Sequence, residues 1–280
     1  MSKLLSANLL RLRKNMCFLA GIIIMIAIGI YLPVNSYLQI EKYSVSANLD
    51  NCLFNGSILI PVILSVFCSL FLGTEYSDGT VRNKIIVGHR RIDIYFANLV
   101  TNFLAGLLLV VVYFAAILIV GIPLLGFLKS EGIEILLCFA VFLGLLCAFT
   151  AVFTMVGMVI ANKASGAVIC VLGVFLLLLA ATFIQSRLIE PKYYTNIQYS
   201  INEEGGGTKG EETRERNPFY IEGTKRKAFQ FLNDFLPGGQ LLQCQGVPVS
   251  KPLLLIGYSI VIFIISTSAG IILFQRKNIN

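Results

Sequence analysis

The chain has 280 residues, of which 56% are hydrophobic and only 13% are charged. A soluble domain has about 25% charged and about 45–50% apolar residues, so a water-soluble fold of this length could not cover so much apolar surface. The composition therefore excludes a soluble protein and indicates that lipid surrounds most of the chain. The net charge of +7 does not indicate nucleic acid binding, because the basic residues form short clusters rather than one stripe.

Six uncharged apolar runs are each long enough to cross a bilayer, which takes about 20 helical residues. None of them contains Asp, Glu, Lys, Arg or His, side chains that are costly at the centre of a membrane-spanning helix. The third and fourth runs are long enough to tilt or break, and Gly121 and Pro123 are the expected break. The sequence thus predicts an all-α, polytopic membrane protein whose spans lie near residues 16–33, 56–74, 94–121, 135–161, 164–184 and 252–274.

The first run has basic residues before it, as a secretory signal does. It lacks a small-residue cleavage site and is longer than the signal-peptide core of about 7–15 residues, so it is interpreted as a retained first span. Before it, apolar residues recur at helical spacing between basic ones, which predicts an amphipathic helix at the inner membrane surface. The alternative is a plain positively charged flank. The apolar positions are Leu5, Leu9, Leu12 and Met16.

The distribution of basic residues predicts the orientation in the membrane. With a cytoplasmic amino terminus, the inner segments hold eleven basic and three acidic residues, whereas the outer segments hold eleven basic and twelve acidic ones. Both termini are therefore expected in the cytoplasm. The predicted organisation is residues 1–184 with spans one to five and an inner loop at 75–93, an extracellular segment at 185–251, and the sixth span with a short tail at 252–280.

The outer segment has two parts with different compositions. Residues 202–216 are rich in Glu and Gly, which is typical of a flexible, solvated linker. Residues 225–236 place apolar side chains at helical spacing and predict a short amphipathic helix on the outer membrane surface, which Pro237, Gly238 and Gly239 would end.

The sequence contains no complete catalytic or cofactor-binding motif, so the chain itself is not expected to be an enzyme. Gly205, Gly207 and Gly210 have the spacing of a dinucleotide-binding loop, but no apolar strand precedes them and the surrounding acids would repel a pyrophosphate. His89 is the only histidine, which excludes a histidine-based zinc site or catalytic triad. No cofactor is expected.

Five of the seven cysteines lie in the apolar runs, where they act as small hydrophobic residues. Only Cys52 and Cys244 lie in outer segments. They would form a disulfide in an oxidising compartment, but two cysteines also fall outside by chance, and the sequence does not decide between these alternatives.

The inner segment after the second run has the most informative pattern. It starts at the membrane face and reads Gly73-Thr74-Glu75-Tyr76-Ser77-Asp78-Gly79-Thr80-Val81-Arg82-Asn83-Lys84, followed by Gly88-His89-Arg90-Arg91. This pattern predicts a polar helix–turn element that displays Glu75, Asp78, Arg82 and Lys84 to the cytosol. Such an element can dock a soluble partner; the alternative is a solvated loop that contacts nothing.

This segment resembles the loop after the second span in permease subunits of type-2 ABC exporters, including antimicrobial-peptide and antibiotic exporters of bacteria. The similarity extends to the basic amphipathic start, the six spans, the inner termini, the large outer segment, and the Leu236-Pro237-Gly238 element. The length of the outer segment departs from the family pattern.

The resemblance implies a bacterial cytoplasmic membrane protein that pairs with a second permease subunit and with two separate ABC ATPase subunits. It implies export of a hydrophobic or peptide substrate, and an ATPase-coupling element formed by Glu75, Tyr76, Asp78, Gly79, Thr80 and Arg82. It also suggests that the second and fifth spans face the partner permease, with Ser65, Phe67, Ser69 and Phe71 lining the path; ordinary helix packing is the alternative. A different class of function, a membrane scaffold or sensor that binds a ligand through its outer segment, is the competing interpretation.

Overall fold

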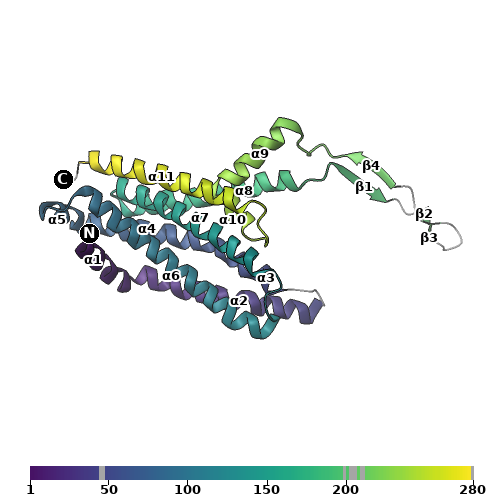
Figure 1. The fold of residues 1–280 in the computed structure, drawn as a ribbon, viewed down its shortest axis with the longest axis horizontal. Helices are drawn as coiled ribbons and strands as arrows, with labels where there is room; N and C mark the ends of the chain where they lie inside the picture. The colour runs from purple at the N-terminus through teal and green to yellow at the C-terminus, as the bar shows by residue number, and fades with distance from the viewer. Residues whose placement is uncertain (44–47, 198–199, 202–206, 209–211, 279–280) are drawn as a thin grey trace.

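The computed structural model describes residues 1–43, 48–197, 200–201, 207–208 and 212–278. Within these residues, six long helices form a bundle that carries short helices at both ends and a hairpin at one end (Figure 1). All six are long and apolar enough to cross a membrane, which confirms the predicted all-α class and the predicted spans. They are α2 (Met16–Tyr43), α4 (Leu59–Ser77) after the 3₁₀ turn η1 (Asn55–Ile58), α6 (Arg91–Leu125), α7 (Gly132–Val159), α8 (Lys163–Ile189) and α11 (Pro252–Arg276).

The predicted break at Gly121 and Pro123 is wrong, because α6 continues through both residues to Leu125. Only Leu124 and Leu125 follow Pro123 in α6, and Gly126, with φ +84°, then ends the helix. Gly121 instead permits a close contact with α3 (Leu49–Leu53). A Cβ atom at this position would overlap a methyl group of Leu49.

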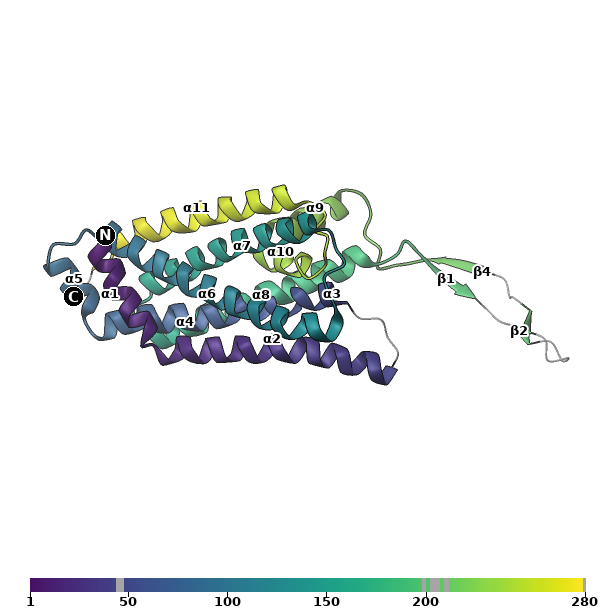
Figure 2. The ribbon, with the colours of Figure 1, turned by 60° about the horizontal axis from the view of Figure 1, so that its bottom comes forward.

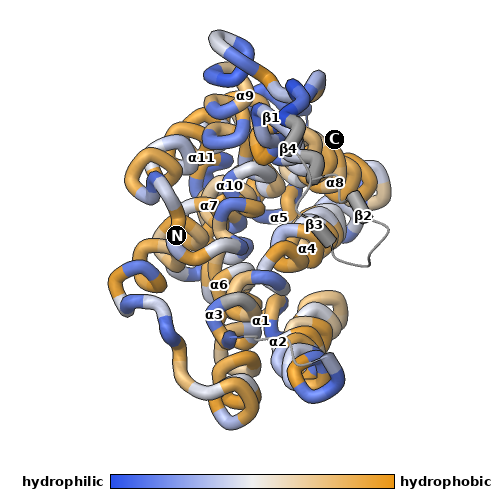
Figure 3. The backbone as a smooth tube through the Cα atoms, turned by 90° about the vertical axis from the view of Figure 1, so that its right-hand side faces the viewer, coloured by the Kyte–Doolittle hydropathy of each residue, from blue (hydrophilic) through white to orange (hydrophobic). Residues whose placement is uncertain are grey.

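The bundle is built from helix pairs in which α7 packs along α11, α2 along α6, and α4 along α8. Helix α4 also contacts α6 and α7, and it has the largest buried share of the six spans. Its neighbours keep much of their apolar surface on the outside, as expected for helices that face lipid. Viewed from the hairpin end, the spans are mostly hydrophobic, and the hydrophilic residues gather in the connecting segments (Figure 3).

The two ends of the bundle differ in structure (Figure 2). One end, called here the α5 end, carries α1 (Ser2–Arg13), α5 (Thr80–Ile86) and the last turn of α11. The opposite end, called the hairpin end, carries α3, α9 (Gly223–Phe235), α10 (Pro237–Gln243) and the strands. The first helix and the last helical turn of the chain therefore lie at the same end of the bundle. This arrangement agrees with the charge pattern, which predicts that both termini are on one side of the membrane.

The predicted N-terminal helix is present, but the face that it buries differs from the predicted stripe. Leu4, Asn8 and Leu12 are the buried residues, because α1 packs against α6 through this face. Leu9 and Met16 are exposed, and Met16 already belongs to α2.

The outer segment is more ordered than its composition predicts. Strand β1 (Tyr193–Ile197) pairs with β4 (Glu212–Arg216) in an antiparallel hairpin, and β2 (Ser200–Ile201) pairs with β3 (Gly207–Thr208). The prediction of a linker across 202–216 is wrong where these strands form; residues 202–206 and 209–211 lie outside the described residues. Helix α9 confirms the predicted amphipathic helix, and Pro237 begins α10 as its first residue.

The disulfide between Cys52 and Cys244 is not formed, because the two cysteines are buried against different helices. The Cys52 sulfur lies 3.0 Å from the Ser36 hydroxyl of α2. The Cys244 carbonyl, at the end of α10, accepts a hydrogen bond of 3.4 Å from the Cys138 thiol of α7. All seven cysteines are free thiols in this structure.

The orientation predicted from the charges can be tested by thiol accessibility. In a cysteine-free background, a cysteine at exposed Glu215 should react with an impermeant maleimide added outside cells, and one at exposed Asn83 should react only after permeabilisation. The cysteine-free protein is the labelling control. The reversed pattern would place the α5 end outside and overturn the predicted topology.

Candidate functional site

The segment that links α4 to α6 forms a compact helix–turn–helix element. Helix α4 ends at Ser77, and Gly79 turns the chain with φ +67°, a left-handed conformation that strains other residues. The hydroxyl group of Thr80 then donates a 2.9 Å hydrogen bond to the carbonyl of Glu75, which satisfies a free carbonyl at the end of α4. This turn aims α5 back toward α1 and α6.

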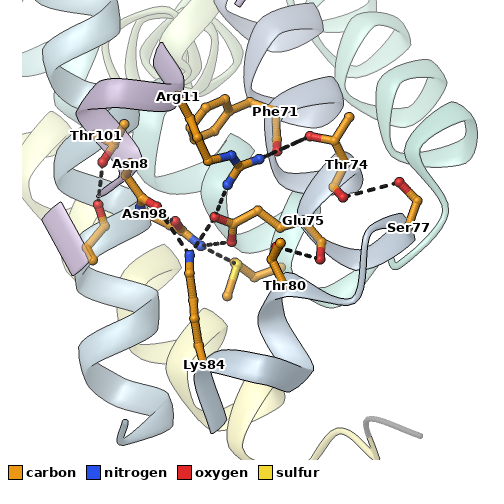
Figure 4. Close-up of polar contacts among 12 residues, drawn as sticks. Asn8, Arg11, Phe71, Thr74, Glu75, Ser77, Thr80, Lys84, Asn98 and Thr101 are labelled. Atoms are coloured by element: carbon orange, nitrogen blue, oxygen red, sulfur yellow. Dashed lines mark hydrogen bonds and ion pairs between the residues drawn. The ribbon is translucent and has the colours of Figure 1, made fainter. Parts of the chain in front are cut away.

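Glu75 is the centre of a buried polar cluster, shown in Figure 4. Its side chain is fully buried, and its carboxylate forms ion pairs with Arg11 of α1 and, at 2.6 Å, with Lys84 of α5. Its second oxygen accepts a 3.0 Å hydrogen bond from the Asn98 amide of α6. The prediction that Glu75 and Lys84 face the cytosol is therefore wrong, because each serves as the other's partner inside the protein.

Asn8 adds a second residue of α1 to this cluster. Its amide donates a 2.6 Å hydrogen bond to Asn98, and its oxygen accepts a 3.2 Å bond from the Lys84 ammonium (Figure 4). One carboxylate thus connects four helices, α1, α4, α5 and α6. The five side chains Asn8, Arg11, Glu75, Lys84 and Asn98 are called the Glu75 cluster below.

The remaining predicted coupling residues divide between inward and outward positions. Asp78 and Arg82 are exposed, as expected. Tyr76 instead points into the protein, where its hydroxyl group donates a hydrogen bond to the Met158 carbonyl of α7. Lys277 donates to the same carbonyl at 3.2 Å and lies 3.9 Å from the centre of the Tyr76 ring; burial lowers the pKa of its ammonium group.

Two exposed apolar residues at the tip of α5 were not predicted. Ile86 and Val87 are 71% and 77% exposed, although they lie beyond the end of the apolar span in a polar segment. Val81, on the opposite side of α5, is buried. The only sequence signal was a short apolar group inside a basic loop. Together with Arg82 and Asn83, these two residues form what is called here the α5 outer face.

Arg91 connects this element to the other end of the chain. Its guanidinium group donates hydrogen bonds of 3.0, 2.8 and 2.6 Å to the carbonyls of Phe274, Gln275 and Lys277. A cation that satisfies free carbonyls at a helix C-terminus is favoured by the helix dipole. Arg91 thus fixes the last turn of α11 to the start of α6.

The four residues expected to line a path are all buried within this single chain: Ser65, Phe67, Ser69 and Phe71. The two serine hydroxyls donate to carbonyls of their own helix, at 2.7 and 2.8 Å. The Phe67 ring lies 5.4 Å from that of Phe18 and 5.2 Å from that of Phe71. The structure therefore gives these side chains a packing role and does not support the predicted path. Within the described residues, no three His, Cys, Asp or Glu side chains gather as metal ligands would.

The Glu75 cluster should be required for stability. Replacing Glu75 with Gln removes the charge that compensates Arg11 and Lys84, and loss of one partner of a buried ion pair costs about 3–5 kcal/mol. Since the Arg11 side chain is one-third exposed, we expect the lower end of that range. The thermal unfolding midpoint of the purified protein measures this loss.

The matched control is Asp78→Asn, which removes an acid from the exposed side of the same turn and should change stability by less than about 0.5 kcal/mol. Equal effects of the two substitutions would contradict a structural role for Glu75.

Comparison with known proteins places this architecture in a family. The sequence matches the family model described as ABC-2 family transporter protein over residues 4–189. The match extends from α1 through α8 and so includes the Glu75 cluster and the α5 outer face. A search of curated proteins found no match. Because the family model covers more than half of the chain, this multi-pass membrane protein belongs to the ABC-2 family, as a membrane subunit of an ABC transporter.

Proposed function

We propose that this subunit exports a hydrophobic or peptide substrate across the bacterial cytoplasmic membrane, with an ATPase docked on the α5 outer face. Membership of the family implies an ABC ATPase partner. In this proposal the α5 end is cytoplasmic, as the excess of basic over acidic residues in its loops favours. The exposure of Ile86 and Val87 is the observation that carries the docking site.

The α5 outer face has the composition of a protein contact. Two neighbouring apolar side chains are exposed beyond the apolar span, and such residues away from lipid favour a protein partner. Arg82 and Asn83 supply polar groups beside them, which matches the usual apolar centre and polar rim of an interface. Asp78 and Gly79 belong to this outer side of the turn.

The inward-facing residues are proposed to transmit movement of the docked ATPase. A movement of α5 is transmitted to α1 and α6 through the Glu75 cluster, because separating the charges of this cluster inside the protein is unfavourable. Tyr76 carries it to α7, and Arg91 carries it to α11. Glu75, Tyr76 and Thr80 thus act as positioning residues in the coupling element and do not contact the ATPase.

A second permease subunit is proposed to complete the transporter. Helix α4 is enclosed by its own chain, so of the two spans named from sequence only α8 offers a surface. The exposed apolar residues along α8 include Val168, Leu172, Phe175, Leu176 and Leu179. Lipid would cover such a surface equally well, and the family resemblance favours a partner subunit.

The substrate and direction of transport rest on the resemblance to exporters of antimicrobial peptides and antibiotics. The competing function is a scaffold or sensor, and the projecting hairpin favours it as a ligand-binding arm (Figure 1). ATP-dependent accumulation of a labelled hydrophobic peptide in inside-out vesicles would distinguish export from sensing.

The docking site is tested by placing a charge on the α5 outer face. The double variant Ile86→Glu/Val87→Glu should lose the ATPase, since removal of interface hot-spot residues weakens binding by about 30-fold or more. The measurements are recovery of the complex from native membranes and ATP hydrolysis after reconstitution. The control Ile133→Glu puts a single negative charge on an exposed residue at the opposite end of the bundle. Full recovery and hydrolysis in the double variant would exclude this docking site.

A further inference from the structure

A cluster of cations lies at the base of the hairpin, where α8 ends and α9 begins. The basic residues of this region are Arg187, Lys192, Arg216, Lys225, Arg226 and Lys227. Three acids lie among them, and two of these, Glu190 and Glu222, are at the junction itself; Glu215 precedes Arg216 in β4. The cations therefore outnumber the acids at the end of the bundle that the charge pattern places outside.

Both acids at the junction are already occupied by neighbours. Glu222 accepts hydrogen bonds from Lys192 at 3.0 Å and Arg216 at 3.2 Å, and the Lys192 ammonium lowers the pKa of this carboxyl group, which keeps it ionised. Glu190 accepts bonds of 2.8 Å from Asn217 and 3.0 Å from Tyr194. Neither acid is left to neutralise the other cations.

Two arginines are held in place by aromatic rings. The Arg187 guanidinium carbon lies 5.4 Å from the centre of the Phe183 ring and 5.1 Å from that of Phe219, and the described residues provide no ion-pair partner for it. Arg226 stacks 5.0 Å from Tyr220 and donates to the Leu188 carbonyl at 3.0 Å. Its other terminal nitrogen is buried without an acceptor in the described part of the chain. Both guanidinium groups are thus ordered, with donor capacity left over.

A hollow of about 460 Å³ opens beside these groups; Arg187, Phe219, Tyr220, Glu222 and Lys225 are among its lining residues. From the length of α8, we expect this hollow to lie at the water–lipid boundary. Helix α8 has 27 residues and is about 40 Å long, whereas the hydrocarbon core measures about 30 Å, so the last turn with Arg187 reaches the headgroup level. Phe183, one turn earlier, is exposed where the acyl region begins.

We propose that this hollow binds the phosphodiester group of an anionic phospholipid in the adjacent leaflet. The Arg187 guanidinium fits two phosphate oxygens, and Lys225 adds a second charge. Phe183 and Phe219 pack beside the glycerol, as aromatic residues do at membrane interfaces. The lipid thereby fastens the base of the hairpin to the membrane surface. This site lies outside the ATPase-coupling end and does not depend on the proposed transport function.

Native mass spectrometry of the full-length protein in detergent tests the proposal. Phosphatidylglycerol should bind more tightly than phosphatidylcholine, and Arg187→Gln/Lys225→Gln should weaken phosphatidylglycerol binding by about 10–100-fold. The matched control is Lys227→Gln, which removes a lysine charge of α9 that lies outside the hollow. This substitution should change the affinity for phosphatidylglycerol by less than about threefold. Arg187→Lys/Lys225→Arg keeps the charge and should retain at least part of the affinity.

Three outcomes would overturn the proposal. The first is equal binding of the two phospholipids by the wild-type protein. The second is unchanged phosphatidylglycerol affinity in the double Gln variant, with its helix content and elution volume as for the wild type. The third is displacement of the lipid by inorganic phosphate at equal concentration, which would identify a site for the free anion.

Discussion

The α5 end of this protein depends on one buried carboxylate. Glu75 is fully buried and compensates two cations from different helices, while Asn98 satisfies its second oxygen. An ion of either sign left alone in this environment costs several kcal/mol, so α1 and α5 are not free to leave α4 separately. Because separating these charges is unfavourable, the ends of α1, α4, α5 and α6 are held together. The hydrogen bonds of Tyr76 and Arg91 at the same end connect α7 and α11 to them.

The Glu75 cluster connects the small α5 outer face to several helices of the membrane domain. The α5 outer face has few residues, but it is mounted on helices that each belong to a different packed pair: α4 with α8, α6 with α2, and, through Arg91, α11 with α7. The described parts of the spans carry few charged side chains, so the pairs contact one another largely through apolar side chains. A 2.9 Å hydrogen bond from the Asn102 amide to the Thr154 hydroxyl also joins α6 to α7. In the proposed coupling mechanism, a movement of α5 is transmitted to several of these pairs.

The sequence predicted the features that depend on local chemistry. Apolar length located the six spans because a helix in lipid must satisfy its backbone internally, and helical spacing located α9. It failed where distant residues decide. Glu75 looks like a surface acid until Arg11 and Asn98 are placed beside it, and strand β4 looks like a linker until β1 pairs with it. Ser65 and Phe67 look like path residues until neighbouring helices cover them.

The basic side chains at the two ends of the molecule have different kinds of partner. At the α5 end, Arg11 and Lys84 share the carboxylate of Glu75 inside the protein. At the hairpin end, Glu222 and Glu190 accept hydrogen bonds from other residues. The Arg187 guanidinium group contacts aromatic rings and has no carboxylate partner among the described residues. Aromatic faces attract a guanidinium group but accept none of its in-plane hydrogen bonds. The donors of Arg187 thus remain available at the headgroup level, where phosphate is the abundant acceptor, and the membrane itself supplies the counter-charge that the chain omits.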